Sequence, residues 1–337
     1  MYSDDDLNAA VDAGIFDADT AQAFRTLVAQ RQHTLLADEE HFRLLSGFND
    51  IFVVIACVLL LGSVAWLAGS VAPLLGAVGV AASAWGLAEF FVRQRRMALP
   101  AIALLAAFVG ACAVATLIAL GEQSRQDELV LLAASSAAGV AAWLHWRRFR
   151  VPLTVAAGAA AALGTVIALL LALWPALDAY TNALLLAGGS VCFVLAMHWD
   201  RQDPARQQRQ SDVAFWLHLL AAPLLVHPFF DMLGILQGSA SLPALVVVLA
   251  LYALFAVLSL AIDRRALMVS ALAYVLYAFS QLLQTAGLEG AGFAVAGLLI
   301  GGGLLTLSAF WQRCRSALLP RLPARWLAGL PALKPVP

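Results

Sequence analysis

Apolar residues recur along this chain in long runs, and short polar segments separate each run from the next. Each run has about 20 residues, the length that a helix needs to cross the hydrocarbon core of a bilayer. Because the connections are short, neighbouring helices should be antiparallel. The pattern predicts an all-α polytopic membrane bundle with ten transmembrane helices, at residues 51–69, 71–92, 98–120, 129–146, 151–174, 182–199, 213–237, 242–262, 266–285 and 291–311.

The composition agrees with a membrane protein. Hydrophobic residues make up 62% of the chain, charged residues make up 12%, and the mean hydropathy is +0.86. Soluble domains have about 45–50% apolar and about 25% charged residues. Membrane lipids are therefore the expected surroundings, and the net charge of -1 gives no reason to expect a nucleic acid partner.

The arginines and the lysine predict how the bundle is oriented. Of the 20 basic residues, 19 fall at the two ends of the chain or in every second connection, and Arg125 lies in a connection of the other kind. Basic residues favour the cytoplasmic side of a membrane, so both termini should be cytoplasmic. Tryptophans gather at the same interface, as amphipathic rings do: Trp143, Trp146, Trp199, Trp216 and Trp311.

Residues 1–48, before the first span, predict a short soluble helical hairpin on the cytoplasmic side. Gly14 supplies the turn, and Asp17 or Asp19 opens the second helix. Asp19 followed by Gln22 fits the spacing of a capping box. The hairpin either docks on the membrane domain or binds a protein partner, and it has too small a core to be an enzyme.

The membrane domain, residues 49–311, divides into two halves of five spans, 51–174 and 182–311. An odd number of spans in each half would give the halves opposite orientations, as in the inverted repeats of many carriers. The basic tail, residues 312–337, mixes arginines, leucines and prolines. It either lies on the anionic leaflet or extends into solvent.

Small residues at a spacing of four predict where helices approach closely. Three such pairs are Ser135 with Gly139, Gly158 with Ala162, and Gly297 with Gly301. The cysteines, Cys57, Cys112, Cys192 and Cys314, are expected to be packing residues because they have no paired spacing.

The seventh span carries an unusual set of residues for a membrane helix. His218, His227 and Asp231 are ionisable, and Pro223 and Pro228 each remove a backbone donor. Such groups inside a membrane are often functional. His227 and Asp231 share a helix face and are close enough to pair, so they either line a polar cavity or proton path or simply sit at the interface. His218 is a candidate for the same cavity or proton path if the kinks at the prolines rotate it toward the other two residues. Without that rotation it falls on roughly the opposite face, where it would donate one hydrogen bond to a carbonyl.

The ninth span offers a polar stripe along one face: Tyr274, Tyr277, Gln281 and Gln284. With the seventh span it forms the candidate polar cavity. The alternative is a purely structural seam of hydrogen bonds between helices.

The remaining polar residues favour structural roles. Glu89 and Arg93 are four residues apart and predict an ion pair at the helix end. His145 and His198 each neighbour a tryptophan and are interpreted as interface residues. The chain has no HExxH, GxSxG or Walker motif, so we expect no metal, no cofactor and no enzymatic activity.

Three stretches resemble a family of uncharacterised bacterial multi-span membrane proteins. They are VDAGIFDADTAQAF at 11–24, SDVAFWLHLLAAPLLVHPFFD at 211–231 and IDRRALMVSALAYVLYAF at 262–279. The resemblance implies a cytoplasmic hairpin followed by a many-span bundle in the bacterial inner membrane, with no activity to transfer. The span count with both ends inside is also similar to the drug and metabolite carrier superfamily, from which the N-terminal hairpin departs.

The functional hypothesis is a carrier or permease with a polar cavity beside the seventh span, and the substrate is undefined. Two alternatives remain open. One is a scaffold or assembly factor that acts through its hairpin and tail, and the other is a lipid-handling protein with a lateral groove.

Overall fold

A computed structural model of the chain describes residues 7, 10–24, 48–121, 127–203, 209–234, 242–285, 287, 291–323 and 330. Within these residues every regular element is a helix, and no strand occurs. Ten of the helices are long and apolar enough to cross a membrane. The predicted all-α fold and the number of candidate spans are therefore confirmed.

The ten long helices follow one another with short connections. Their bounds are α3 (Phe48–Gly69), α4 (Pro73–Ala88), α5 (Ala98–Gly121), α6 (Asp127–Phe149), α7 (Leu153–Leu173), α8 (Thr181–Gln202), α9 (Arg209–Met232), α10 (Leu242–Ile262), α11 (Ala266–Thr285) and α12 (Gly292–Ala309). A π-helical turn, η1 (Glu89–Gln94), extends α4, and a 3₁₀ helix, η2 (Pro175–Tyr180), precedes α8. The seventh span begins earlier than predicted and its helix ends at Met232, while residues 235–241 lie outside the described ranges.

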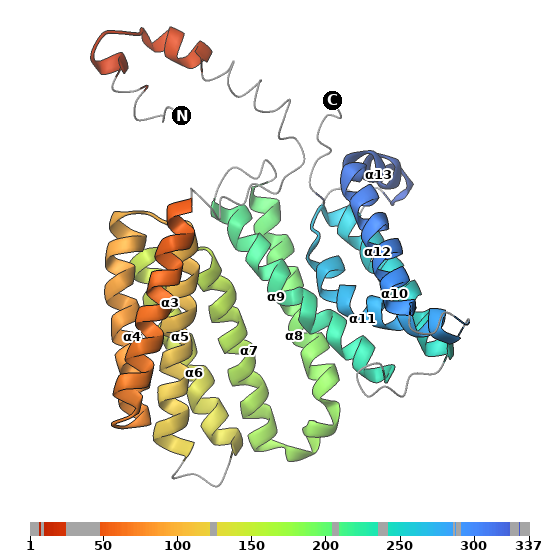
Figure 1. Ribbon diagram of the computed structural model, residues 1–337, viewed down its shortest axis with the longest axis horizontal. Coiled ribbons are helices and arrows are strands. Elements are labelled where there is room, and N and C mark those ends of the chain that lie inside the picture. The colour runs from red at the N-terminus through yellow and green to blue at the C-terminus, as the bar shows by residue number, and fades with distance from the viewer. Residues whose placement is uncertain are drawn as a thin grey trace.

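Helix α9 lies at the centre of the bundle. Figure 1 shows α3–α7 as one group and α10–α12 as another, with α8 and α9 between them. Helix α9 packs against α7, α8 and α11. In its most apolar 18-residue window 50% of the residues are buried, compared with 33% in α10 and α11. The two groups correspond broadly to the predicted halves, and the inverted relation between them stays a prediction.

One end of the bundle gathers the arginine-bearing turns. Helix α3 begins there and α12 ends there (Figure 1). The turns after η1, α6 and α10 lie at this end, and they contain Arg96, Arg150 and Asp263 in left-handed backbone conformation with φ of 53°, 57° and 57°. We call it the arginine-rich end.

The described part of the N-terminal segment contains the predicted turn. Gly14 has a φ of 69°, and residues 18–24 are helical after it. The carboxylate of Asp17 accepts a hydrogen bond from the backbone N–H of Thr20 at 2.8 Å, which makes Asp17 the N-cap and lowers its pKa. The predicted capping box is wrong, because Asp19 lies inside the helix. The remainder of residues 1–48 lies mostly outside the described ranges.

A further helix follows the last span. Helix α12 ends at Ala309, and α13 (Trp311–Leu318) and the 3₁₀ turn η3 (Leu319–Arg321) follow. Helix α13 packs against α10 and α12, and its Trp311 is only 3% exposed. Trp311 therefore begins α13 and does not belong to the tenth long helix, and the described part of the tail docks on the bundle.

Small residues bring α6 and α7 together as predicted. A Cβ added to Gly158 would lie 3.8 Å from Cβ of Ala142, and one added to Gly139 would lie 3.8 Å from Cβ of Ala161. The same prediction is wrong for α12. No heavy atom of the described neighbours lies within 4 Å of a Cβ added to Gly297 or Gly301.

Candidate functional site

His218 belongs to a buried cluster at the arginine-rich end. Its Nε2 lies 3.0 Å from Oδ2 of Asp200, in the last turn of α8. Arg264, between α10 and α11, donates from Nη2 to Oδ1 of Asp200 at 2.6 Å and from Nε to Oδ2 at 3.3 Å. None of these three side chains is more than 5% exposed. With Ser211 they form what we call the Asp200 cluster, which joins α8, α9 and the α10–α11 connection.

The end of α10 explains why Arg264 turns inward. Asp263 adopts the left-handed conformation, and the N–H of Arg264 donates to the carbonyl of Ser259 at 3.0 Å, the geometry that ends many helices. Glycine usually occupies this left-handed position, and aspartate tolerates it better than most residues. Nη2 of Arg264 also lies 3.3 Å from both the carbonyl oxygen and Oγ of Ser211, at the start of α9.

The contacts of the Asp200 cluster offset the free energy of burying its charges. Removing an ion from water costs several kcal/mol, and burial is tolerated when the partners are close and their hydrogen bonds are satisfied. Both carboxylate oxygens of Asp200 are used, and the planar guanidinium of Arg264 matches their fork. The carboxylate and guanidinium charges cancel, so His218 adds a net positive charge only when it binds a second proton.

A second set of contacts lies toward the opposite end of α9. Nδ1 of His227 is 2.8 Å from the hydroxyl oxygen of Tyr274 on α11. Nδ2 of Asn182 on α8 donates to Oδ2 of Asp231 at 2.8 Å. The ring of Phe230 stacks on Tyr274 with 4.5 Å between centroids. His227 and Asp231 therefore each contact a different neighbouring helix.

The structure divides the polar stripe that was predicted on the ninth span. Tyr274 faces α9, whereas Tyr277 is 36% exposed. Gln281 is half-buried and Gln284 is exposed. The stripe therefore does not point as a whole into one site beside α9.

Glu89 has a partner that its local spacing did not indicate. Nη1 of Arg93 is 3.4 Å from Oε2 of Glu89, the predicted pair. The guanidinium of Arg148 on α6 makes a closer, two-bond contact, from Nε to Oε1 at 2.5 Å and from Nη2 to Oε2 at 2.9 Å. This ion pair joins η1 to α6 and has a structural geometry.

His145 is a core residue, so its interpretation as an interface residue is wrong. The side chain is fully buried, and Nδ1 lies 3.3 Å from the hydroxyl oxygen of Thr154 on α7. The rings of Trp85 and Phe149 pack around it, with centroids at 6.4 Å and 4.6 Å. His198 is exposed, as an interface residue should be.

Helix α13 is tied to the turn that carries Arg264. Nε1 of Trp311 donates to Oδ1 of Asp263 at 2.7 Å, and Nε of Arg315 donates to the carbonyl of Leu260 at 3.2 Å. Burial lowers the pKa of Arg315, and the charge of Asp263 opposes this shift. Hydrogen bonds thus link α13 to the residue next to Arg264 in the chain, and through Arg264 to α8 and α9.

Asp200 and Arg264 were not among the residues predicted for a site. Two features of the sequence could have indicated them. Asp200 lies near the end of a span, and Asp263 and Arg264 lie in a connection that is too short to extend far from the bundle. In the part of the chain that the structure describes, no group of three or more His, Cys, Asp or Glu residues is placed to hold a metal ion.

Comparison of the chain with models of known protein families, with curated proteins and with solved structures found no match. The class is accordingly set by the fold. The ten apolar helices are those of a multi-pass integral membrane protein, and side chains of its central helix α9 make polar contacts with α8, α11 and Arg264.

Proposed function

We propose that the protein is a carrier of the bacterial inner membrane, without enzymatic activity, and that its translocation path runs along α9. In this proposal both termini and the arginine-rich end face the cytoplasm. The distribution of 19 of the 20 basic residues to one side supports this orientation. The bacterial origin rests on the resemblance of three stretches to bacterial multi-span proteins.

The observation that carries the proposal is the buried Asp200 cluster. Ionisable residues buried inside a membrane bundle commonly mark substrate, ion or proton pathways, and this cluster is buried where three helices meet at the arginine-rich end. Arg264 connects the α10–α11 turn to α8 and α9 through Asp200 and Ser211. Separating these helices requires breaking that contact, so the cluster is suited to act as a gate at the cytoplasmic end.

His218 offers a way to couple such a gate to a proton. Its imidazole and Arg264 share the Oδ2 atom of Asp200, at 3.0 Å and 3.3 Å. A second proton on His218 strengthens its attraction to Asp200 and introduces a positive charge beside Arg264. Protonation would therefore weaken the hold of Arg264 and favour opening. The contacts of His227 with Tyr274 and of Asp231 with Asn182 would close the opposite end.

A second candidate function is a scaffold that recruits a protein partner through the N-terminal segment. Ile15 and Phe16 in its turn are 70% and 43% exposed. Exposed apolar residues on a soluble segment often mark a protein contact. This candidate needs no movement of the Asp200 cluster.

The two candidates differ in whether the cluster opens. Ser211, behind Arg264, is 7% exposed and would become reachable through an opening gate. In a chain whose four native cysteines are replaced by alanine, Ser211→Cys should react slowly with a membrane-impermeant thiol reagent in inside-out vesicles, and faster when Asp200→Asn is added.

Ser259→Cys is the matched control, because Ser259 is fully buried on α10 and should stay unlabelled in both backgrounds. A carrier is contradicted if Ser211→Cys stays unlabelled in both backgrounds. Labelling from the periplasmic side alone would contradict the proposed orientation.

A further inference from the structure

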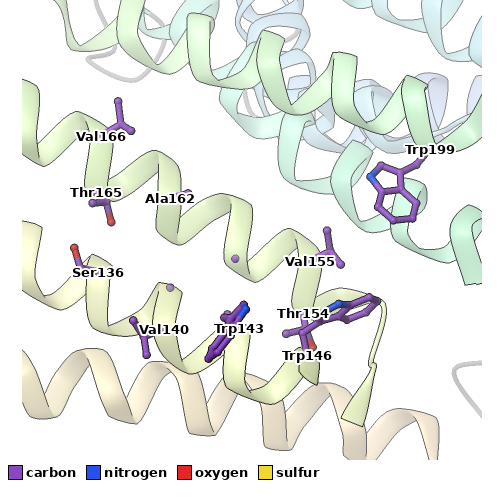
Figure 2. A pocket seen from close by; sticks show the side chains of 13 residues that line it. Ser136, Val140, Trp143, Trp146, Thr154, Val155, Ala162, Thr165, Val166 and Trp199 are labelled. Atoms are coloured by element: carbon purple, nitrogen blue, oxygen red, sulfur yellow. The ribbon is translucent and has the colours of Figure 1, made fainter. Parts of the chain in front are cut away.

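A groove with a volume of about 870 Å³ runs along α6 and α7. Figure 2 shows the side chains that line it, with Trp199 of α8 close to one end. Small residues form much of its wall, among them Gly139, Gly158 and Ala162. Deeper in the membrane the hydroxyls of Ser136 and Thr165 donate to the backbone carbonyls of Leu132 and Ala161, at 2.7 Å and 2.8 Å, so these polar groups already have partners. The groove is therefore suited to an apolar occupant.

The groove changes character at the arginine-rich end. Trp143, Trp146 and Trp199 line it there. The guanidinium of Arg147 lies 4.9 Å from the ring centroid of Trp143, and that of Arg150 lies 5.4 Å from the ring centroid of Trp146. Both arginines are exposed. Stacking uses the flat face of a guanidinium and leaves the N–H groups on its edge directed outward, where they can bind an anion.

The length of the groove matches one leaflet of a bilayer. Along α6 its lining residues run from Ser136 to Trp146, or about 15 Å at about 1.5 Å per residue. The hydrocarbon core of a bilayer is about 30 Å thick, so this is about half of it. Tryptophans at one end of an apolar path place that end at the level of the headgroups.

We propose that this groove is a binding site for an anionic phospholipid. One acyl chain lies along the small residues of α6 and α7, and the phosphate is held by Arg147 and Arg150. The tryptophan rings border the glycerol region between them. Arg148, between the two arginines in sequence, is engaged by Glu89, so the two stacked arginines supply the charge that selects the lipid.

A second groove of about 530 Å³ offers a contrast. It lies on α3, α4 and α5, and its lining residues include no charged or aromatic side chain. Lipid chains can enter it, but nothing in its lining distinguishes an anionic headgroup from a zwitterionic one. Charge selectivity is therefore expected at the α6–α7 groove and not at the α3–α5 groove.

The test measures lipid binding to the purified full-length protein by native mass spectrometry, with phosphatidylglycerol and phosphatidylethanolamine of identical acyl chains. Wild type should retain phosphatidylglycerol more strongly. A basic residue near an anionic lipid contributes about 1 kcal/mol, or about fivefold in affinity, so Arg147→Gln with Arg150→Gln should weaken phosphatidylglycerol binding about 30-fold. Binding of phosphatidylethanolamine should change little.

The matched control is Arg95→Gln with Arg313→Gln. These arginines are also exposed and stack on Phe90 and Phe310, each with 5.5 Å to the ring centroid, but neither stacks on a lining residue of the groove. This control should bind phosphatidylglycerol as wild type does. Equal loss in the two double variants, or equal retention of the two lipids by wild type, overturns the proposal.

A variant that fills the groove tests the acyl chain separately. Ala162 lines the groove and is exposed, so Ala162→Trp should reduce the binding of the tightest phosphatidylglycerol molecule without entering the core. Leu298→Trp, at a 74% exposed position on α12, controls for added bulk. Unchanged binding in folded Ala162→Trp contradicts occupancy of the groove, and the arginine variants decide the question if Ala162→Trp does not fold.

Discussion

Removing one charge from the Asp200 cluster should destabilise the protein strongly. Asp200→Leu leaves the guanidinium of Arg264 buried. Of the hydrogen bonds described above, this guanidinium keeps those to the carbonyl oxygen and Oγ of Ser211, both at 3.3 Å. The substitution also removes the two hydrogen bonds, at 2.6 Å and 3.3 Å, that this guanidinium donates to the carboxylate of Asp200, a residue that is only 5% exposed. Breaking a buried ion pair in this way costs about 3–5 kcal/mol. We expect a loss of that size in the free energy of unfolding.

A double-mutant cycle separates the pair from its surroundings. Asp200→Leu, Arg264→Met and the double variant are compared by denaturant titration in one detergent. The double variant should recover most of the loss, because replacing both partners of a buried pair by apolar residues is often neutral. Glu89→Gln is the control at a more exposed pair and should have a much smaller effect. Additive losses, or equal losses in Asp200→Leu and Glu89→Gln, would show that the buried Asp200–Arg264 pair does not carry this stability.

Two further predictions concern the contacts of α9 and α13. Gly189→Ala should destabilise the α8–α9 pair, because the added Cβ would lie 3.0 Å from the backbone carbonyl carbon of Leu224. Gly62→Ala, in open space, should not lower the melting temperature, and equal effects would contradict the close approach. Trp311→Phe removes the indole N–H that donates to Asp263. This substitution should speed tryptic cleavage after Arg315, whose side chain is completely buried in the wild-type protein. An unchanged cleavage rate would show that this hydrogen bond does not hold α13.

The spans could be predicted because their signal is local. A run of about 20 apolar residues has few alternatives to a membrane helix. The Asp200 cluster could not be predicted in the same way, since Asp200 and Arg264 are 64 residues apart in sequence. Hydropathy places both at the ends of helices, where a charged residue usually reaches solvent. Only the left-handed turn at Asp263 directs Arg264 inward.

Helical periodicity identified faces of α9 but not their neighbours. His227 and Asp231 share a face, as their spacing indicates, yet their contacts described above are to Tyr274 and Asn182 on different helices. Glycine spacing has the same limitation. Gly297 and Gly301 on α12 have the four-residue spacing of a helix-packing motif, yet they face open space. Gly189 belongs to none of the predicted pairs, yet it lies against the backbone of α9 at Leu224.

In a carrier of the kind proposed above, the Asp200 cluster opens and closes the arginine-rich end. Distances between spin labels test it without knowledge of the substrate. Labels at Arg95, on the first group of helices, and at Ala317, on α13, are both exposed at that end. In lipid nanodiscs we expect two distance populations, with the longer one increased by Asp200→Asn. A single distance distribution that Asp200→Asn leaves unchanged would show that the cluster is not a gate.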